Sequence, residues 1–478
     1  MRVLGAFFLN VLFNFAVGLL VAKFLGPAEY GRFALALATA MAVQTFFLDW
    51  LRLGATRFYS ERTRGEEPAL RATLDLAFAA VTCALAVAST CLFMTGGHFP
   101  LSNALIALAL GVAVSNGLFD FNTALVRARF HDRLYTRLII VKNLLAFTLI
   151  GGGAFYFASA KMALIGGILS ASGSVIAARA ALSDPFAQAH MARIRIARSI
   201  LRYSMPIVAA NLLYICIPLA NRALITIYYG FSETGQFSLA FDIGTKAVQA
   251  IGSTLDVVLF QIAVAAHDRF GAERSKQKIA DNMAIVIAIM LPACVGIWLV
   301  LPSLQQLIVP VDYRGPFDQL LTLMLPGLFC FAMILYGLNP IFQIAKRTGP
   351  LIAAAVAGCI ADPIILFAMP RGGGAQTLAI AQSGAFFVAL VTLIGVACLS
   401  RPHWPRWQDV ASTCLGTAAM TAVLLPLRSQ PPSVIILVEQ VLGGIAIYAA
   451  IVAGLDIANL RTILLERLRP MVARFNPG

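Results

Sequence analysis

The chain has 478 residues, of which 60% are hydrophobic and 12% charged, and its mean hydropathy is +0.84. Because a soluble domain is about half apolar and about a quarter charged, this composition excludes a water-soluble globular protein. The net charge of +14 would suit nucleic-acid binding in a soluble protein. Here the basic residues form short clusters between apolar runs, which is the pattern of cytoplasmic loops. We therefore predict an all-α polytopic membrane protein that binds no nucleic acid.

Taken in chain order, fourteen apolar segments are long enough to cross a bilayer as helices, which takes about 20 residues. They lie at 3–24, 31–53, 71–94, 104–126, 138–158, 162–183, 203–228, 236–264, 279–301, 319–343, 351–369, 376–399, 409–427 and 433–456. The first resembles a signal peptide, but no A-x-A cleavage site follows it, so we interpret it as a retained span. Pro363 and Pro426 interrupt two of the last four segments.

The distribution of Lys and Arg predicts the orientation. If the N-terminus lies in the cytoplasm, 26 of the 36 Lys and Arg residues fall on the cytoplasmic side, six on the outer side and four inside spans. Cytoplasmic loops of membrane proteins carry such an excess of positive charge. We therefore expect an even number of spans and both termini in the cytoplasm.

A short frame, G-x-x-E-x-G-x-F-x-L-A, occurs twice, starting at Gly26 and again at Gly230. Each copy lies in a short outer turn between the first two spans of one half of the chain. Six predicted spans separate the copies, and an even number preserves the direction of the chain through the membrane. We therefore expect two parallel repeats related by an axis along the membrane normal, a transporter design that places the substrate site between the repeats.

The frame is expected to serve architecture rather than chemistry. Its glycines suit a tight turn and a close approach of helices. These glycines are Gly26, Gly31, Gly230 and Gly235. Glu29 and Glu233 lie just ahead of the second span of each half, where a carboxylate can cap the helix N-terminus and complement its dipole.

The repeat divides the chain into four predicted parts. They are an N-lobe at 1–183, an amphipathic interlobe linker at 184–202 on the inner membrane surface, a C-lobe at 203–399, and two extra spans with a basic cytoplasmic tail at 400–478. The fold class is thus two pseudo-symmetric six-helix lobes plus two C-terminal helices.

The segment 19–58, "LLVAKFLGPAEYGRFALALATAMAVQTFFLDWLRLGATRF", resembles the start of bacterial Wzx-type polysaccharide flippases. These belong to the multidrug/oligosaccharidyl-lipid/polysaccharide exporter superfamily. The residues that carry the resemblance are Leu25-Gly26, Tyr30-Gly31, Phe33 and Leu53-Gly54. Many relatives have twelve spans. Fourteen spans would mean two added C-terminal helices, as in the peptidoglycan-precursor flippase.

The resemblance implies a transporter, not an enzyme, in the bacterial inner membrane, with no cofactor. Its cargo would be an undecaprenyl-pyrophosphate-linked oligosaccharide for O-antigen (lipopolysaccharide), capsule or exopolysaccharide, and its partners membrane lipids, a polysaccharide polymerase and chain-length proteins. Three alternatives stay open: a multidrug/cation antiporter of the same superfamily, a peptidoglycan-precursor flippase, and a membrane glycosyltransferase or polymerase. The last lacks the large outer loop and the motifs that such chemistry uses.

Polar residues inside the spans are the candidates for a site, because such groups usually face a cavity or a partner. Arg222 and Lys246 are predicted to share the pyrophosphate of the cargo. Asn10, Asn14, Asn211 and Asn221 are candidates for the cavity wall, and Asp120 and Asp242 for ion coupling. An intrahelical pair of Lys246 with Asp242 is the alternative interpretation.

Several chemistries have no signal in the sequence. The eight cysteines lie in apolar segments without a C-x-x-C spacing, which fits small apolar filler residues rather than a disulfide framework or a zinc site. The five histidines form no H-x-x-x-H pair, so we expect no metal. The chain has no G-x-x-x-x-G-K-[ST], the motif of nucleotide hydrolysis by a P-loop.

Overall fold

The computed structural model describes residues 2–94, 100–345, 347–370, 372–399 and 402–461, and the regular structure in these ranges is entirely helical. By length and composition, twelve helices of the described chain can cross a membrane, and a bent pair of helices raises the number to thirteen. Helices suit hydrocarbon because every backbone polar group is satisfied within the segment. The predicted all-α polytopic membrane fold is confirmed.

The helices cover nearly the whole described chain. Those of the first half are α1 (Arg2–Phe47), α2 (Asp49–Phe58), α3 (Glu61–Glu66), α4 (Pro68–Met94), α5 (Asn103–Ala128), α6 (Asp132–Phe157), α7 (Ala160–Ala177), α8 (Arg179–Leu182), η1 (Ala189–Met191), α9 (Ile194–Tyr229) and α10 (Phe231–Phe270). Those that follow are α11 (Ala272–Ile308), η2 (Val311–Tyr313), α12 (Pro316–Ala332), η3 (Met333–Leu338, a π-helix), α13 (Asn339–Ile344), α14 (Gly349–Ala368), α15 (Gly374–Leu399), α16 (Trp407–Arg428), α17 (Val434–Leu455) and η4 (Ile457–Asn459).

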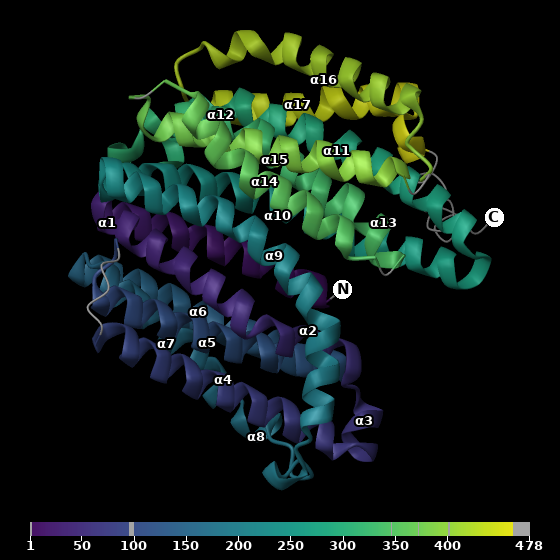
Figure 1. Cartoon of the computed structure of the whole chain (residues 1–478). Helices are drawn as coiled ribbons and strands as arrows, with labels where there is room; N and C mark the ends of the chain where they lie inside the picture. Colours follow the sequence, from purple (N-terminus) through teal and green to yellow (C-terminus); the bar gives the residue numbers. More distant parts are fainter. Residues whose placement is uncertain (1, 95–99, 346, 371, 400–401, 462–478) are drawn as a thin grey trace, which may run out of the picture. The chain divides into compact units, whose positions relative to one another are not determined.

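The long helix α1 contains the first two predicted spans. Its backbone is non-helical at Gly26, where two helices join across a kink. In Figure 1 the first part runs from the N-terminus to the left edge, and the second part returns toward α2. If these two parts are counted separately, the thirteen candidate spans of the described chain become the predicted fourteen.

The twelve predicted spans from 71–94 onward each correspond to a long helix of the described chain. The two prolines that interrupt the sequence pattern do not end their helices. Pro363 lies inside α14, and Pro426 lies two residues before the end of α16. The predicted C-terminal pair of spans is therefore present as α16 and α17, while the basic tail beyond residue 461 lies outside the described residues.

Backbone contacts divide the chain into two compact units, one of residues 1–239 with 369–378 and one of residues 240–368 with 379–478. The predicted lobes at 1–183 and 203–399 stay a prediction.

Apolar side chains build the core of the first unit from several helices. Leu51, Leu74 and Ile200 are buried where α2, α4 and the start of α9 meet. Leu35 and Leu164 are buried in a second cluster, which joins α1, α5 and α7. Because α9 contributes to this unit along its length, the described core holds the first helices of both predicted halves.

Ion pairs connect three loops at one end of the first unit. Arg129 donates to Glu61 at 2.6 Å, and Arg64 donates to Asp184 at 3.1 Å. Tyr59 donates its hydroxyl to the same Asp184 carboxylate, also at 3.1 Å. The Arg129 hydrogen bond lowers the pKa of the Glu61 carboxyl below its usual value. These contacts fix the loops that follow α2, α5 and α8.

The segment predicted as an amphipathic linker is helical for only part of its length. Residues 184–193 contain the short helix η1, and from Ile194 the chain is continuous with α9. Ile200 is buried, whereas Ile194 is 80% exposed. The apolar face of this segment is thus only partly used by the described fold, and its place on a membrane surface stays a prediction.

The second unit contains the two C-terminal helices packed on α11. Leu299 of α11 forms a buried cluster with Met420 and Leu424 of α16. On α17, Tyr448 donates its hydroxyl to the backbone oxygen of Ala288 on α11, at 2.6 Å. The helices α16 and α17 are therefore integral parts of this unit.

Candidate functional site

The two copies of the repeated frame form backbone turns of the same kind. Gly26 has φ 68° and ψ 171°, and Gly230 has φ 88° and ψ 176°. This combination is open essentially to glycine alone. In each copy a helix ends at the glycine and the next helix begins directly after it, at Pro27 and at Phe231. The predicted tight turns are therefore present, with the same geometry twice.

The second glycines of the two copies meet each other inside the first unit. A Cβ atom added at Gly31 would lie 2.0 Å from the carbonyl oxygen of Phe231, and one added at Gly235 would lie 2.0 Å from that of Pro27. These contacts are reciprocal, so the two turns are related by a local two-fold axis. Two backbones cross here at a distance that excludes any side chain, and such close approach is what small residues permit between membrane helices.

The glutamates of the frame do not share one role. Glu29 accepts a hydrogen bond at 2.9 Å from the backbone N–H of Ala160, the first residue of α7, and also pairs with Arg32. Ser159, at the N-cap of α7, makes no side-chain cap. The carboxylate therefore caps α7 and not its own helix, which corrects the predicted partner. Glu233 is half-buried in the first turn of α10, and its carboxylate makes no hydrogen bond or ion pair among the described residues.

Arg222 lies beside this crossing. Its side chain is on α9 and is 5% exposed, and Nη1 donates to the backbone oxygen of Ala34 at 3.4 Å. One turn further along α9, Thr226 shares a 2.8 Å hydrogen bond with Thr234 of α10. Asn221 is fully buried next to Arg222 in the chain. A buried cation and polar groups therefore accompany the crossing of the two turns.

The other predicted cargo and ion-coupling residues are spread over the chain. Lys246 and Asp242 are half-buried on α10 and belong to the second unit, whereas Arg222 belongs to the first. Asn14 is exposed on α1 and Asn211 is half-buried on α9. Asn10 lies in the part of α1 whose side chains are outside the described residues. The predicted sharing of one anion by Arg222 and Lys246 thus stays a prediction.

Asp120 lies in a charged cluster inside the first unit. Gln44 donates to its carboxylate at 2.8 Å. Asp49 and Arg52 form a two-point ion pair at 3.1 and 3.2 Å. The charge of Asp120 acts on both of them and on Lys142. The cluster therefore brings two carboxylates and two basic side chains together from α2, α5 and α6, with Gln44 of α1 beside them.

This cluster could only partly be read from the sequence. Asp49 and Lys142 lie near the ends of their predicted spans, a position that by itself favours simple contact with the membrane interface. Nothing in the spacing connects positions 49, 120 and 142, because they come from three different helices. Asp49 has a fixed cation in Arg52, and Asp120 is held by the amide of Gln44.

The described residues offer no place for a metal. No group of three or more His, Cys, Asp or Glu side chains in the described chain could hold an ion. The eight cysteines are free thiols.

The fold defines a class of membrane protein. It is similar to that of the lipid II flippase MurJ in its inward closed conformation, with a TM-score of 0.71 and 13% identity over 94% of this chain and 98% of the other. It is also similar to an inward-facing multidrug resistance MATE family transporter of the MOP superfamily, with a TM-score of 0.57 and 14% identity over 82% and 96%. This is the fold of membrane flippases and exporters.

The sequence then defines the family. A family model described as "Polysaccharide biosynthesis protein" matches residues 20–311, and the chain belongs to this family. A search by sequence found no similar protein among those with curated functions. The resemblance inferred from segment 19–58 is confirmed, and the chain is a multi-pass membrane protein with a transporter fold.

Proposed function

We propose that this protein flips an undecaprenyl-pyrophosphate-linked oligosaccharide across the bacterial inner membrane for the assembly of a surface polysaccharide. The observation that carries the proposal is the family match over 20–311 in a chain whose fold is similar to a lipid flippase over 94% of its length. The excess of positive charge in the predicted inner loops supports cytoplasmic termini. A polysaccharide polymerase and chain-length proteins are the partners that this role requires.

The charged cluster around Asp120 supports a flippase over a cation antiporter. An antiporter needs a carboxylate that can exchange one cation for another. Here Asp49 is already paired with Arg52, and Asp120 accepts a hydrogen bond from Gln44. Both carboxylates have partners within the fold, which suits a structural role better than cation exchange.

A second candidate is a flippase for the peptidoglycan precursor. The observation in its favour is that the similarity to MurJ covers 94% of this chain, whereas that to the MATE transporter covers 82%.

A reconstituted assay separates these functions. The purified chain is placed in liposomes with a fluorescent lipid-linked oligosaccharide or with fluorescent lipid II, and a membrane-impermeant reductant reports the label that reaches the outer leaflet. We expect transport of the oligosaccharide lipid to exceed that of lipid II. Faster flipping of lipid II would favour the second candidate. Export of a cationic dye without flipping of either lipid would favour the antiporter.

Arg222 and Lys246 are the proposed partners of the pyrophosphate. A guanidinium offers planar donors to phosphate oxygens, and an ammonium offers a mobile point charge. We expect Arg222→Ala and Lys246→Ala, alone and combined, to lower flipping at normal protein levels in the membrane. Full transport by the double variant would reject the pair. Loss in Arg222→Lys as well would indicate bidentate recognition rather than charge alone.

A further inference from the structure

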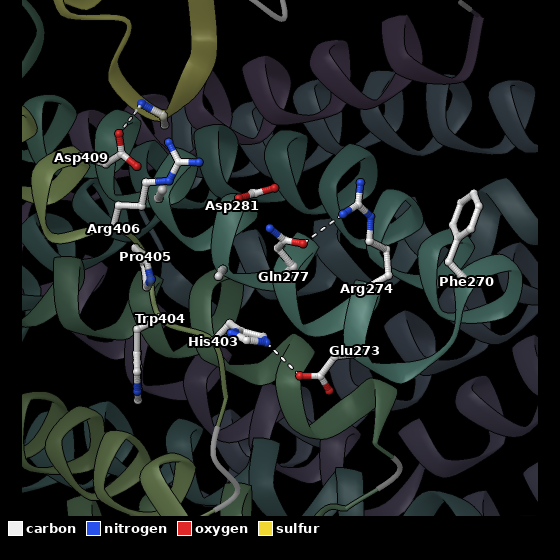
Figure 2. Close-up of a pocket in the computed structure, with 13 residues that line it drawn as sticks. Phe270, Glu273, Arg274, Gln277, Asp281, His403, Trp404, Pro405, Arg406 and Asp409 are labelled. Atoms are coloured by element: carbon white, nitrogen blue, oxygen red, sulfur yellow. Dashed lines mark hydrogen bonds and ion pairs between the residues drawn. The ribbon is translucent and has the colours of Figure 1, made fainter.

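The second unit contains a cavity at the ends of two membrane helices. It has a volume of about 560 Å³ and lies between the end of α10, the first turns of α11, residues 403–406 and the start of α16, with Ala458 at one side. Figure 2 shows the side chains of these segments around one space. Ligand pockets commonly measure about 300–1,000 Å³.

Two carboxylates around this cavity are already paired. Glu273 accepts from Lys276 and contacts His403, both at 3.0 Å. Asp281 pairs with Lys278 at 3.0 Å. Within the described chain these pairs satisfy two of the three carboxylates in the lining.

Three charges in the lining have no partner of opposite charge among the described residues. Arg274 donates to the neutral Gln277 at 3.1 Å, and Arg406 is exposed. One carboxylate oxygen of Asp409 accepts from the backbone N–H of Ala458 at 3.2 Å. The cavity therefore offers two guanidinium groups and one carboxylate oxygen to a ligand.

The surroundings of the cavity are those of a membrane interface. Trp404, Trp407 and Phe270 are 39%, 76% and 72% exposed beside it, and Trp is enriched where membrane meets water. The lining continues along α11 from Glu273 to Ala284, which is about 16 Å at a rise of about 1.5 Å per residue. The polar end of the cavity thus leads to an apolar end within a candidate span.

The geometry points to a site for the head group of a phospholipid that carries both a phosphate and a primary ammonium, as phosphatidylethanolamine does. The guanidinium groups of Arg274 and Arg406 bind the phosphodiester, since Arg matches phosphate oxygens well. The ammonium donates to the second carboxylate oxygen of Asp409. The acyl chains then follow α11 toward Ala284. This inference does not rest on the proposed function and needs only that the chain lies in a membrane.

The chemistry of the lining selects against the other common head groups. A glycerol head group brings a phosphate but no cation, so the Asp409 carboxylate stays unpaired beside an anion. A choline head group brings a cation without N–H donors. Basic pockets between membrane helices bind anionic lipids, but here the extra carboxylate favours a zwitterion.

The test measures thermal unfolding of the full-length protein in detergent during titration with one lipid at a time. We expect phosphatidylethanolamine to raise the unfolding temperature until the site is saturated. Phosphatidylglycerol and phosphatidylcholine should bind at least about tenfold more weakly. Glycerophosphoethanolamine, the same head group without chains, should also bind weakly. Equal effects of the three lipids on the wild-type protein would overturn the site, and tight binding of the soluble head group would show that its ligand is not a lipid.

Variants then assign the contacts. Arg406→Gln should weaken binding of all phosphate-bearing lipids about tenfold. Asp409→Asn keeps an oxygen that can accept from the Ala458 N–H but loses the negative charge. It should therefore abolish the preference of the protein for phosphatidylethanolamine over phosphatidylglycerol. Arg269→Gln, an exposed arginine outside the lining, is the matched control and should behave as wild type. An unchanged preference in Asp409→Asn would contradict the assignment of the ammonium.

Discussion

The crossing of Gly31 and Gly235 can be tested by adding a single methyl group. In Gly31→Ala the new Cβ would lie 2.0 Å from a backbone oxygen, and ordinary contact begins at 3.4 Å, so the helices must separate by about 1.4 Å. Backbone atoms cannot rotate away as a side chain can. Overpacking of this kind costs about 1–3 kcal/mol, and we expect the same loss of stability in Gly235→Ala.

The reciprocal geometry makes a sharper prediction for the double variant. Once the first methyl group has separated the helices, the second enters space that is already open. The two losses should therefore not add, and the coupling between them should be about 1 kcal/mol or more, within the range seen for residues in contact. Two independent sites would give additive losses.

The assay is the free energy of unfolding in mixed micelles with increasing denaturing detergent, measured for both single variants and the double. Gly152→Ala is the matched control, because no atom lies within 4 Å of its added Cβ and alanine favours a helix over glycine by about 1 kcal/mol. This control should be neutral or stabilising. Wild-type stability in Gly31→Ala, or strict additivity in the double variant, would refute the close crossing.

Three further predictions follow from the contacts above. Glu29→Ala should cost about 0.5–2 kcal/mol through the lost cap, whereas Glu233→Ala should stay within about 0.5 kcal/mol, and equal losses on thermal unfolding would contradict their unequal contacts. Single cysteines at the exposed positions Ser102 and Ser199 test the predicted orientation. A membrane-impermeant thiol reagent applied to intact cells should label Ser102→Cys but not Ser199→Cys. Labelling of Ser199→Cys alone would show that the predicted orientation is reversed. The pKa of Glu61 is lowered, so its charge stabilises the fold above the ordinary Glu pKa of about 4.3, and this stabilisation is lost as pH falls through the lowered pKa. The unfolding free energies of wild type and Glu61→Gln should therefore converge in acid. A difference between them that is independent of pH would reject the ion pair.

Much of this protein is determined by its sequence alone. Apolar runs must become helices in hydrocarbon, because no other unpaired segment satisfies its backbone there. For the same reason the spans containing Pro363 and Pro426 form in spite of these residues. The two turns of the duplicated frame could also be predicted from the sequence, because the backbone conformation at Gly26 and Gly230 is open essentially to glycine alone.

Tertiary structure alone decided which residues meet. The frame is short and local, but the contact of Gly31 with the turn at Gly235 joins positions about 200 residues apart, and spacing carries no information on it. The same holds for Glu29, whose carboxylate caps α7 through a contact that spans 131 positions. The cluster around Asp120 joins charged residues from three helices. At the cavity of the second unit, Arg274, Arg406 and Asp409 lack a partner of opposite charge among the described residues because their charged neighbours pair with one another. A sequence pattern fixes the face of a helix and its depth, whereas the partner on the facing helix is set by how the helices pack.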